Sequence, residues 1–487
     1  MGVVKTVQLG MKNRAKAAEE QRRADEERRH AEAVEREFRE IHDAQGDPEL
    51  LEPIVERIER EYREIYEARA FAKQGDKYEK SKAMARALEL EQQADLIEGL
   101  RKKIVRECKA HYIKELIPEA YAREVSKPIE NKLIFMENGN CPSPSNSHLI
   151  SVLKKMGTYT IHKTGLKRRR VSELEYYENA LAFAADAATA KTVFISSAND
   201  VFSHVEMRPE TKLIQLWHGV GMFKRVGWST VDKSFGKGVE ERREYDQYRN
   251  YTYVTIAGKA QAWTFEDAMH IPADSGVIVP VGVARTDVFY DPHFVATARE
   301  RLLAHFPQIG DRKLILYAPT FRGDVGNGKA PDQLDIDKLG QALSDEYVLL
   351  IKYHNLSKDI PPIPQRWEET FAFNMNKNSI LSIERLLSIA DICITDYSSI
   401  GFEYAIMERP LIFFAYDLDE YLDTRGMYYD YDEVTPGPIC KTNEEMIDYI
   451  QHIDERFDKQ QVIDFKKKYV GACDGHATER TIALIES

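Results

Sequence analysis

The sequence predicts an α/β protein with two Rossmann-like halves that follow a helical first quarter. After Pro128, short apolar runs alternate with amphipathic helical patterns, which is typical of a parallel sheet with helices on its faces. The alternation restarts near Lys313, so two sheets are expected rather than one. With 487 residues the chain has room for about three domains of roughly 150 residues each. We expect boundaries that give regions 1–128, 129–290 and 291–487.

The first quarter has a helix-forming composition. It is dense in Glu, Lys, Arg, Gln and Ala from about residue 8 to about residue 125. Apolar residues recur at helical spacing over 51–66 and again over 84–113, and Gly75 interrupts the pattern between them. About three helices are therefore expected, as antiparallel hairpins or a coiled coil. A charged arm or spacer is the simplest role, and oligomerisation or docking of a partner is the alternative.

Ten apolar runs after Pro128 are expected to be strands. The first six are KLIFMEN from Lys132, TYTIHK from Thr158, TVFISS from Thr192, KLIQLWHG from Lys212, YTYVTIAG from Tyr251 and GVIVPVG from Gly276. The other four are KLILYAPT from Lys313, YVLLIKYH from Tyr347, DICIT from Asp391 and PLIFFAYD from Pro410. Helices are expected between them, for example over 148–156, 172–188, 335–344 and 382–389. Ligands of such sheets bind beyond the carboxyl ends of the strands, so the informative residues follow each strand.

Composition excludes several classes of protein. Lys and Arg total 68 against 80 Asp and Glu, a net charge of −12, which argues against binding to bulk nucleic acid. The five cysteines lie far apart without a CxxC pair, so neither a disulfide framework nor a zinc site is expected. The expected compartment is the reducing cytosol. No apolar run is long enough to span a bilayer, and the start of the chain lacks the apolar core of a signal peptide. No HExxH, GxSxG or His/Cys cluster indicates a metal or a nucleophile elbow.

The segment LWHGVGMFKRVG places His218 just after a strand, in a turn of small residues. Gly219 and Gly221 let backbone amides approach a bound group, and a histidine in this place can take a proton from an attacking hydroxyl near neutral pH. A structural histidine that caps the turn is the alternative.

The segment YVLLIKYHN carries Lys352 and His354 on either side of Tyr353, at the end of an apolar strand. Strand alternation would point Lys352 and His354 to one face, where they would suit a phosphate or diphosphate. A solvated strand end is the alternative.

The segment DICITDYSSIGFEYAIMERPLIFFAYD has the strongest local pattern. Asp396 follows a strand, and Ser398 and Ser399 are placed to cap the next helix, where hydroxyls and free amides suit a diphosphate. Glu403 follows one turn later and could accept hydrogen bonds from ribose hydroxyls. Ordinary helix capping would also explain the serines.

Two arginines also follow predicted strands, Arg285 in VGVARTDVF and Arg322 in YAPTFRGD, where Thr320 precedes the latter. A guanidinium there offers a planar fork for a phosphate, although ion pairs with carboxylates are the more common use of arginine.

In this order, the segments from ENKLIFMEN through LWHGVG, GVARTD, YAPTFRGD and IKYHN to ITDYSSIGFEYAIMERPLIFFAYDLDEYLDTRGMYYDYDEVTPGPI resemble the CDP-glycerol glycerophosphotransferase family. The resemblance covers about three quarters of the chain and omits the helical first quarter. It implies a two-domain, glycosyltransferase-B-like fold, with an acceptor domain over 129–290 and a CDP-donor-binding domain over 291–487. It implies attack of an acceptor's terminal hydroxyl on the β-phosphorus of CDP-glycerol, with release of CMP, no cofactor and no metal.

The resemblance also implies roles for individual residues. His218 is the general base, and His354 stabilises the diphosphate as charge moves to the leaving CMP. Further contacts to the donor are expected from Gly219, Val220, Gly221, Met222, Arg285, Pro319, Thr320, Lys352, Tyr353, Ser398, Ser399 and Glu403, with Arg322 and Asp396 as secondary candidates. The family commonly reads WHGTPLK where this chain reads WHGVGMFK, so we expect the loop to gain freedom and lose a hydroxyl.

The partners implied are CDP-glycerol and a lipid-linked or polymeric glycerol phosphate acceptor, at the cytoplasmic face of the cell membrane. The basic clusters LKRRR from Leu166 and FKR from Phe223 are candidate contacts to anionic headgroups, or else solvated loops. Three alternatives stay open: transfer from CDP-ribitol or another CDP-polyol, a nucleotide-sugar glycosyltransferase on the same fold, and an inactive transferase-like scaffold. Whether one unit or many are added is also open.

Overall fold

The structure is a computed structural model that describes residues 53–54, 56–57, 60, 99–100, 102–167, 173–233, 236–323, 328–377 and 380–487. Most of the predicted helical first quarter, including the proposed coiled coil, lies outside the described residues. So does the basic run from Arg168 to Arg170. The domain boundaries at residues 128 and 290 stay predictions.

The chain divides into two compact units. The smaller unit contains the described part of the first 124 residues, with 167–186 and 204–206. In it, a helix over 102–111 passes through a π-helical turn, η1 (Tyr112–Leu116), into α4 (Ile117–Glu124). Tyr112 stacks on Tyr177 of α6 (Glu173–Ala187) with ring centroids 5.2 Å apart. Aromatic stacking therefore ties the two helical segments of this unit together.

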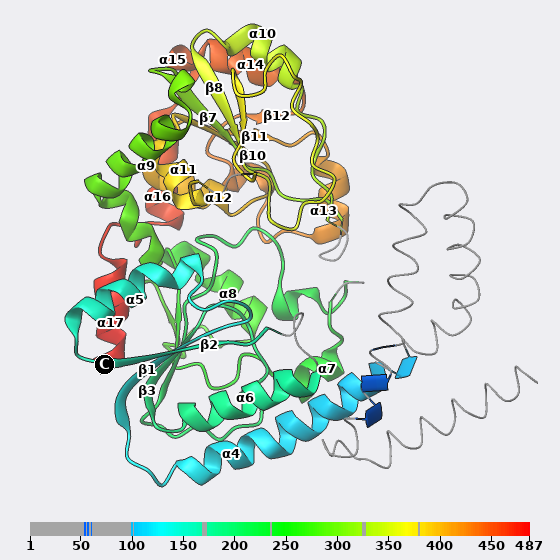
Figure 1. The fold of residues 1–487 in the computed structure, drawn as a ribbon, viewed down its shortest axis with the longest axis vertical. Helices are drawn as coiled ribbons and strands as arrows, with labels where there is room; N and C mark the ends of the chain where they lie inside the picture. Colours follow the sequence, from blue (N-terminus) through cyan, green and yellow to red (C-terminus); the bar gives the residue numbers. More distant parts are fainter. Residues whose placement is uncertain are drawn as a thin grey trace, which may run out of the picture. The chain divides into compact units, whose positions relative to one another are not determined.

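The larger unit holds two parallel sheets, of which the first has the strand order β2-β1-β3-β4-β5-β6 (Figure 1). Its strands are β1 (Glu130–Glu137), β2 (Thr160–Gly165), β3 (Ala190–Ile195), β4 (Lys212–Gln215), β5 (Tyr253–Thr255) and β6 (Ile278–Val279). Helices α5 (Pro144–Met156), α7 (Val239–Glu244) and α8 (Ala262–Met269) belong to the same half. The last helix, α17 (Ala477–Glu486), returns to this sheet, because Ile485 packs in one cluster with Leu133 and Phe194.

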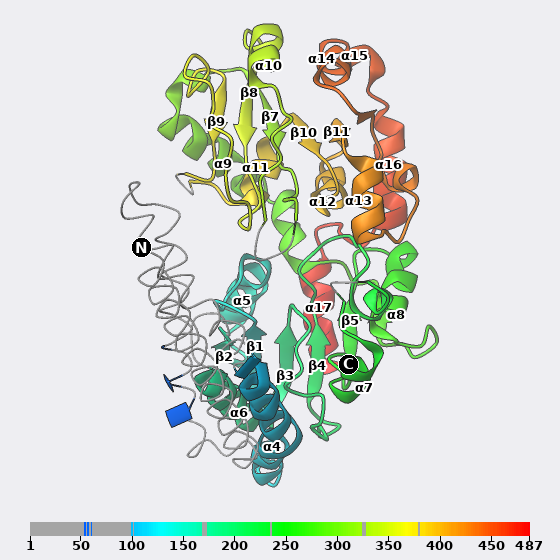
Figure 2. The same cartoon turned by 90° about the vertical axis from the view of Figure 1, so that its right-hand side faces the viewer.

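The second sheet has the order β12-β11-β10-β7-β8-β9 (Figure 2). Its strands are β7 (Lys313–Tyr317), β8 (Tyr347–Ile351), β9 (Ala372–Asn374), β10 (Ile392–Thr395), β11 (Leu411–Phe414) and β12 (Ile439–Cys440). Alternate residues enter opposite cores, as strand geometry requires: Leu314 and Leu316 lie in one cluster, Ile315 and Tyr317 in the other. Burial of both faces explains why these strands read as continuous apolar runs.

Helices cover both faces of the second sheet. The first cluster is closed by α9 (Pro292–His305), α11 (Ile383–Ile389), α12 (Ile400–Tyr404) and α16 (Lys459–Tyr469), and the other by α10 (Ile336–Leu343), α14 (Asn443–Gln451) and α15 (Ile453–Arg456). Between α12 and the last helices lie α13 (Leu418–Arg425) and the short turns η6 (Ala405–Met407) and η7 (Tyr431–Val434). In the first half the remaining turns are η2 (Gly227–Thr230), η3 (Lys259–Gln261) and η4 (Ala284–Tyr290), whereas η5 (Pro307–Ile309) packs Ile309 into the first cluster of the second sheet.

The predicted fold class is confirmed: two parallel sheets with helices on their faces. All ten predicted apolar runs contain strands. The structure adds β9 and β12, of three and two residues, at the two edges of the second sheet. Neither lies in a long apolar run, whereas β5 and β6, which are equally short, were predicted because the apolar runs YTYVTIAG and GVIVPVG contain them.

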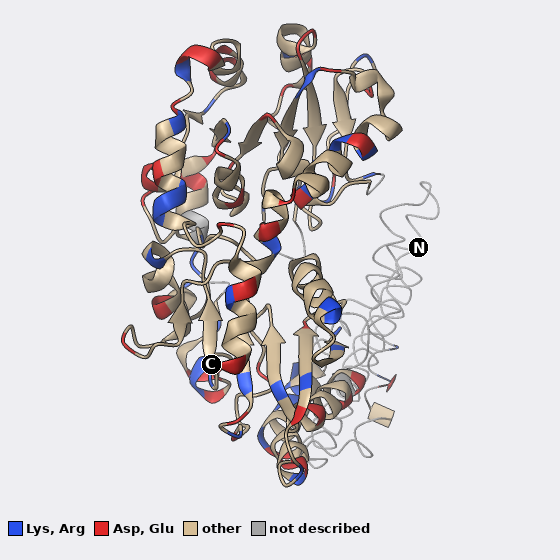
Figure 3. Ribbon diagram, turned by 90° about the vertical axis from the view of Figure 1, so that its left-hand side faces the viewer, with Lys and Arg blue, Asp and Glu red and all other residues tan. Residues whose placement is uncertain are grey.

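Charged residues lie mostly on helices and loops, and the strands of both sheets carry few (Figure 3). Among the described residues, acidic and basic positions are interspersed along the helices. In the part of the chain that the structure describes, no helix is both long enough and apolar enough to cross a membrane.

Candidate active site

A strained turn presents His218 at the carboxyl edge of the first sheet. Strand β4 ends at Gln215, and two residues later Trp217 adopts a left-handed conformation with φ of 58°. The Gln215 side-chain oxygen accepts a hydrogen bond from the Trp217 backbone N–H at 2.9 Å, which holds this turn. A bulky residue with positive φ is rare and is concentrated at functional sites. The turn leaves the His218 side chain exposed beside the ring of Trp217.

The hydrogen bond of His218 selects one tautomer. Its Nδ1 lies 3.2 Å from the backbone oxygen of Ser196, at the end of β3. A carbonyl oxygen can only accept, so Nδ1 carries the proton, and Nε2 of the neutral ring keeps a lone pair. The surrounding protein desolvates most of the ring, although one side of it reaches solvent, and this desolvation lowers the pKa of His218. The positive charge of Arg285 lowers it further, against the opposing effects of Ser196 and Glu137. His218 is therefore neutral near pH 7, with a basic nitrogen available.

Glu137 holds the partner of His218 in place. This buried carboxylate ends β1 and accepts hydrogen bonds from the Ser143 hydroxyl at 2.6 Å, from the Asn146 amide and from the Ser196 hydroxyl. Ser196 is thus fixed through its side chain while its carbonyl fixes His218. Neither Glu137 nor Ser196 was predicted, although each ends an apolar run, in ENKLIFMEN and TVFISS.

The loop after His218 is held firmly, which corrects the expectation that it gains freedom. The buried Gln261 side chain accepts from the Met222 backbone N–H at 3.2 Å and donates to the backbone oxygens of Val220 at 3.1 Å and Tyr469 at 2.7 Å. The side chains of Val220 and Met222 are buried. These two residues can therefore offer a ligand only their backbone. No sequence pattern pointed to Gln261.

Gly219 and Gly221 bring the loop against α12 of the other half. A Cβ on Gly219 would lie 3.5 Å from the Ser399 hydroxyl oxygen. A Cβ on Gly221 would lie 2.2 Å from the Phe402 ring, so only glycine fits there. Phe402 is fully buried and packs edge-to-face against Phe223 at 5.0 Å, so its ring has no room to withdraw. The histidine loop and the serine segment are therefore neighbours, as the sequence predicted of residues at carboxyl ends.

Replacing Gly221 by alanine is expected to lower the free energy of unfolding by about 1–3 kcal/mol, because the added methyl group overpacks this contact. Urea denaturation measures the effect. The matched control is Gly238→Ala, since a Cβ on Gly238 meets no atom within 4 Å. Equal stability of the two variants would contradict the close packing described here.

Asp396, Thr320 and Arg322 form a buried network at the edge of the second sheet. Asp396 accepts from the Thr320 backbone N–H at 2.9 Å, from the Thr320 hydroxyl at 3.0 Å and from Arg322 at 2.8 Å. Arg322 also donates to Asp417 through Nε and Nη2. All three guanidinium nitrogens thus bond to protein acceptors. Arg322 holds the loops after β7, β10 and β11 together. The sequence had suggested instead that its guanidinium binds a phosphate.

Ser398 and Ser399 open α12 with their side chains partly exposed. The Ser398 hydroxyl accepts from the Ile400 backbone N–H at 3.3 Å. Ser399 occupies the N-cap position, yet its side chain makes no cap hydrogen bond. Ordinary capping therefore accounts for Ser398 only, and the Ser399 hydroxyl beside Gly219 is left for another partner.

Glu403 and Arg285 join the two halves through a buried ion pair. Arg285 Nη2 donates to Glu403 Oε2 at 2.8 Å, and Arg285 Nη1 lies 3.7 Å from Glu384 Oε1. Burial raises the pKa of Glu403, Arg285 opposes this, and the charge of Glu384 adds to it. Oε1 of Glu403 is buried and has no hydrogen-bond partner. The guanidinium predicted to bind phosphate is shared between two carboxylates.

Lys352, Tyr353 and His354 follow β8, which ends at Ile351 before any of them. The alternation that would point Lys352 and His354 to one face therefore does not apply. Lys352 Nζ donates to the Met375 carbonyl at 3.0 Å, and burial lowers the pKa of this lysine. The Tyr353 side chain lies in the core of the second sheet. Of the three, His354 is exposed.

His354 takes the tautomer opposite to that of His218. Its Nδ1 accepts from the Leu356 backbone N–H at 3.2 Å, so the neutral ring carries its proton on Nε2. Its ring lies 5.2 Å from that of Phe321. Burial lowers the pKa of His354, as does the positive charge of Lys224, which belongs to the loop after His218. One histidine thus offers an acceptor and the other a donor.

The predicted site residues fall into three groups. Several meet across the two halves: Gly219, Ser399, Arg285 and Glu403. Others are engaged in the scaffold: Val220, Gly221, Met222, Thr320, Arg322, Lys352, Tyr353, Asp396 and the buried Pro319. His218, His354, Ser398 and Ser399 present polar atoms at the surface of their loops. Among the described residues, no group of three or more His, Cys, Asp or Glu side chains could hold a metal ion.

The chain is similar in sequence to a family of known proteins. Residues 121–487 match the family model described as CDP-glycerol:poly(glycerophosphate) glycerophosphotransferase. The teichoic acid poly(ribitol-phosphate) polymerase of Bacillus spizizenii is 32% identical over 364 residues, which cover 73% of this chain and 56% of that protein. The teichoic acid glycerol-phosphate transferase of Staphylococcus aureus is 31% identical over 291 residues, covering 57% of this chain and 72% of that protein.

A solved structure agrees in fold. The wall teichoic acid polymerase TagF superposes with a TM-score of 0.63 at 22% identity, over 79% of this chain and 94% of that chain. The match spans only just over half the length of the B. spizizenii polymerase. The family match itself covers both sheets and every loop described above. The chain belongs to the CDP-glycerol:poly(glycerophosphate) glycerophosphotransferase family.

Proposed function

We propose that this protein transfers a polyol phosphate from a CDP-activated donor, CDP-glycerol in the first instance, to the terminal hydroxyl of an acceptor, and releases CMP. The observation that carries the proposal is the pair of exposed histidines with opposite tautomers, on loops at the carboxyl edges of the two sheets. Displacement at phosphorus needs an acceptor for the proton of the nucleophile and donors for the developing charge. His218 offers the proton acceptor, and His354 offers a hydrogen-bond donor.

In the proposed step, Nε2 of His218 accepts the proton of the attacking hydroxyl as its oxygen bonds to the β-phosphorus. The bond from the β-phosphorus to the bridging oxygen breaks, and that oxygen leaves with CMP. His354 donates from Nε2 to the diphosphate and stabilises the charge that moves onto CMP. The Ser399 hydroxyl, free of the cap and next to Gly219, is a further donor to the diphosphate. The product is a phosphodiester, and the proton on His218 passes to solvent.

The polyol of the donor differs among the relatives of this chain. Relatives named as ribitol-phosphate and as glycerol-phosphate enzymes are about equally similar to this chain, at 32% and 31% identity. This favours CDP-ribitol as the second candidate. The acceptor we propose is a lipid-linked or polymeric polyol phosphate met at the cytoplasmic face of the membrane, with the protein bound peripherally. A glycosyltransferase or an inactive scaffold is disfavoured by the intact histidine pair.

A competition experiment identifies the polyol. Purified protein is incubated with equal CDP-glycerol and CDP-ribitol and a defined lipid-linked polyol phosphate acceptor, and the products are analysed by mass spectrometry. We expect acceptor extended by glycerol phosphate units, with CMP released in equal amount. Extension by ribitol phosphate would show that CDP-ribitol is the donor and that the type of reaction is as proposed. No extension and no CMP would contradict the proposed function.

A further inference from the structure

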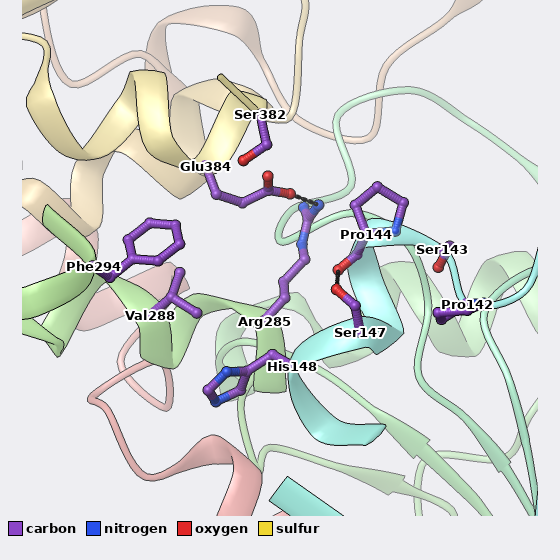
Figure 4. Close-up of a pocket in the computed structure, with 10 residues that line it drawn as sticks. All are labelled: Pro142, Ser143, Pro144, Ser147, His148, Arg285, Val288, Phe294, Ser382 and Glu384. Carbon is purple, nitrogen blue, oxygen red and sulfur yellow. Dashed lines mark hydrogen bonds and ion pairs between the residues drawn. The ribbon is translucent and has the colours of Figure 1, made fainter. Parts of the chain in front are cut away.

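The three cations that the sequence predicted for the donor diphosphate are bonded to the protein itself. Arg285 is shared between two carboxylates, and Figure 4 shows that of Glu384 directed at its guanidinium. Arg322 also bonds to two carboxylates, and Lys352 donates to a backbone carbonyl. Desolvation lowers the pKa of both site histidines, so they are mostly neutral near pH 7. A diphosphate is anionic, and its displacement is favoured by a cation, so the donor site needs a further positive charge.

Lys224 is a cation that belongs to the histidine loop, and its backbone is held against the residues that follow α13. Phe223 and Arg225, on either side of it, form backbone hydrogen bonds of 3.0 and 3.3 Å to residues 426–428. Lys224 itself pairs with Met427 in an antiparallel bridge. Lys224 is partly buried, whereas Arg225 is exposed. Of these two basic residues, Lys224 is therefore the one that the protein encloses.

The side chain of Lys224 reaches the tyrosines beside the serine segment. Its Nζ lies 5.3 Å from the centre of the Tyr421 ring. That ring stacks on Tyr397, with centroids 3.8 Å apart and planes 20° apart. Tyr397 directly precedes Ser398, so the ammonium lies within two ring layers of the segment that opens α12. A ring face attracts a cation without cancelling its charge, so Lys224 still acts on an anion nearby.

Lys224 also lies near His354, on the loop after β8. Its positive charge is the second cause, after desolvation, of the lowered pKa of His354. Charges act on one another less as their separation grows, so this effect agrees with the placement of the ammonium among the site loops. Three loops thus meet around Lys224: its own, the serine segment and the loop after β8. An anion bound by His354 and Ser399 would lie in the field of Lys224.

We propose that Lys224 binds the diphosphate of the nucleotide donor and stabilises the negative charge that the leaving CMP acquires, an inference that rests on the function proposed above. The ammonium donates hydrogen bonds and keeps its proton throughout. Its three donors on a flexible stem suit a phosphate group, and the Tyr421 ring positions them. The sequence had suggested that the cluster from Phe223 to Arg225 contacts anionic headgroups; the partial burial of Lys224 favours a ligand within the site.

Direct binding of nucleotides tests the proposal without turnover. The full chain is titrated calorimetrically with cytidine and with CDP, as the wild type and as Lys224→Met. The wild type should bind CDP more tightly than cytidine. Lys224→Met should lose about tenfold in affinity for CDP, the effect of one hydrogen bond to a charged group, and should bind cytidine unchanged. Lys224→Arg keeps the positive charge and should recover most of the affinity for CDP.

The matched control is Lys313→Met. Lys313 Nζ lies 5.4 Å from the Tyr347 ring, a contact like that of Lys224 with Tyr421, but Lys313 begins β7, whereas ligands bind beyond the carboxyl ends of such strands. This variant should bind CDP and cytidine as the wild type does. Lys224→Gln repeats the test with a polar side chain, and melting temperatures show which variants are folded. An equal loss of CDP affinity in Lys224→Met and Lys313→Met, or no loss in either, would overturn the proposal.

Kinetics separate this proposal from the proposed function. Lys224→Met should lower kcat/KM for the donor at least tenfold and leave the KM for the acceptor within about twofold. Transfer with an unchanged kcat/KM for the donor would overturn the role of Lys224 and leave the reaction as proposed. Loss of CDP affinity in Lys224→Met, in a protein whose wild type transfers nothing, would support the role of Lys224 and contradict the reaction. A wild type that binds CDP no more tightly than cytidine would overturn the role of Lys224, whatever its transfer activity.

Discussion

His218→Ala is expected to lower kcat for polyol phosphate transfer between about a hundredfold and about ten-thousandfold, the range for loss of a general base. The ring reaches solvent and is hydrogen-bonded to the Ser196 carbonyl, so the fold should survive the substitution. Steady-state CMP release measures the effect. The control is His452→Ala, another histidine bonded to a backbone carbonyl, whose loss should leave kcat unchanged. Loss of activity with loss of the folded state, seen by circular dichroism, would contradict a chemical role.

The pH profile provides a second readout of the same residue. Burial and Arg285 lower the pKa of His218 below its ordinary value, and the base acts when neutral. The neutral form therefore predominates at pH 7, and kcat/KM should fall as the pH drops through that lowered pKa. Replacing Arg285 by leucine removes a positive charge and should move this acid limb to higher pH. An acid limb above the ordinary histidine pKa in the wild type would contradict the assignment.

Arg322→Leu is expected to lower the free energy of unfolding by about 3–5 kcal/mol, because it removes the guanidinium that pairs with the buried Asp396 and the partly buried Asp417. Asp396 is only 2% exposed, and Asp417 also depends on Arg322. Asp396 in turn holds the backbone of Thr320, so transfer activity should fall as well. Denaturant titration by circular dichroism measures the stability.

The matched control is Arg366→Leu. Arg366 pairs with Asp337 at 2.6 Å, but its side chain is 56% exposed and that of Asp337 44%. Exposed pairs contribute about 0–1 kcal/mol, so this variant should remain near the wild type. A similar loss of stability in both variants would mean that burial does not make the ion pairs of Arg322 stronger than an exposed pair, and would contradict this account.

The sequence predicted the strands that form long apolar runs. Apolar runs of five residues or more, such as β1, β7 and β8, alternate between two cores or are buried throughout, and each was found. The edge strands β9 and β12 were missed because neither lies in a long apolar run, unlike the equally short β5 and β6. Most of the first quarter lies outside the described residues, so its helices remain a prediction.

The sequence predicted those site residues that directly follow a strand. His218 and Ser399 each follow a strand, and the topology alone brings such loops together. The partners of Arg285 and Arg322 could not be predicted, since Glu403 and Asp417 lie about a hundred residues away along the chain. The glycine that replaces the common proline of the histidine loop suggested mobility. The structure shows a different reason for it, because Phe402 occupies the space of any side chain at Gly221.

The most direct test of the central claim follows the β-phosphorus. Protein is mixed with CDP-glycerol or CDP-ribitol labelled with ³²P at the β-position and with a polyol phosphate acceptor, and the labelled products are separated. The account predicts label in the acceptor as a phosphodiester, with unlabelled CMP in equal amount, and no such transfer by His218→Ala. Label released as CDP would show cleavage at carbon, as in a glycosyltransferase, and would contradict the account.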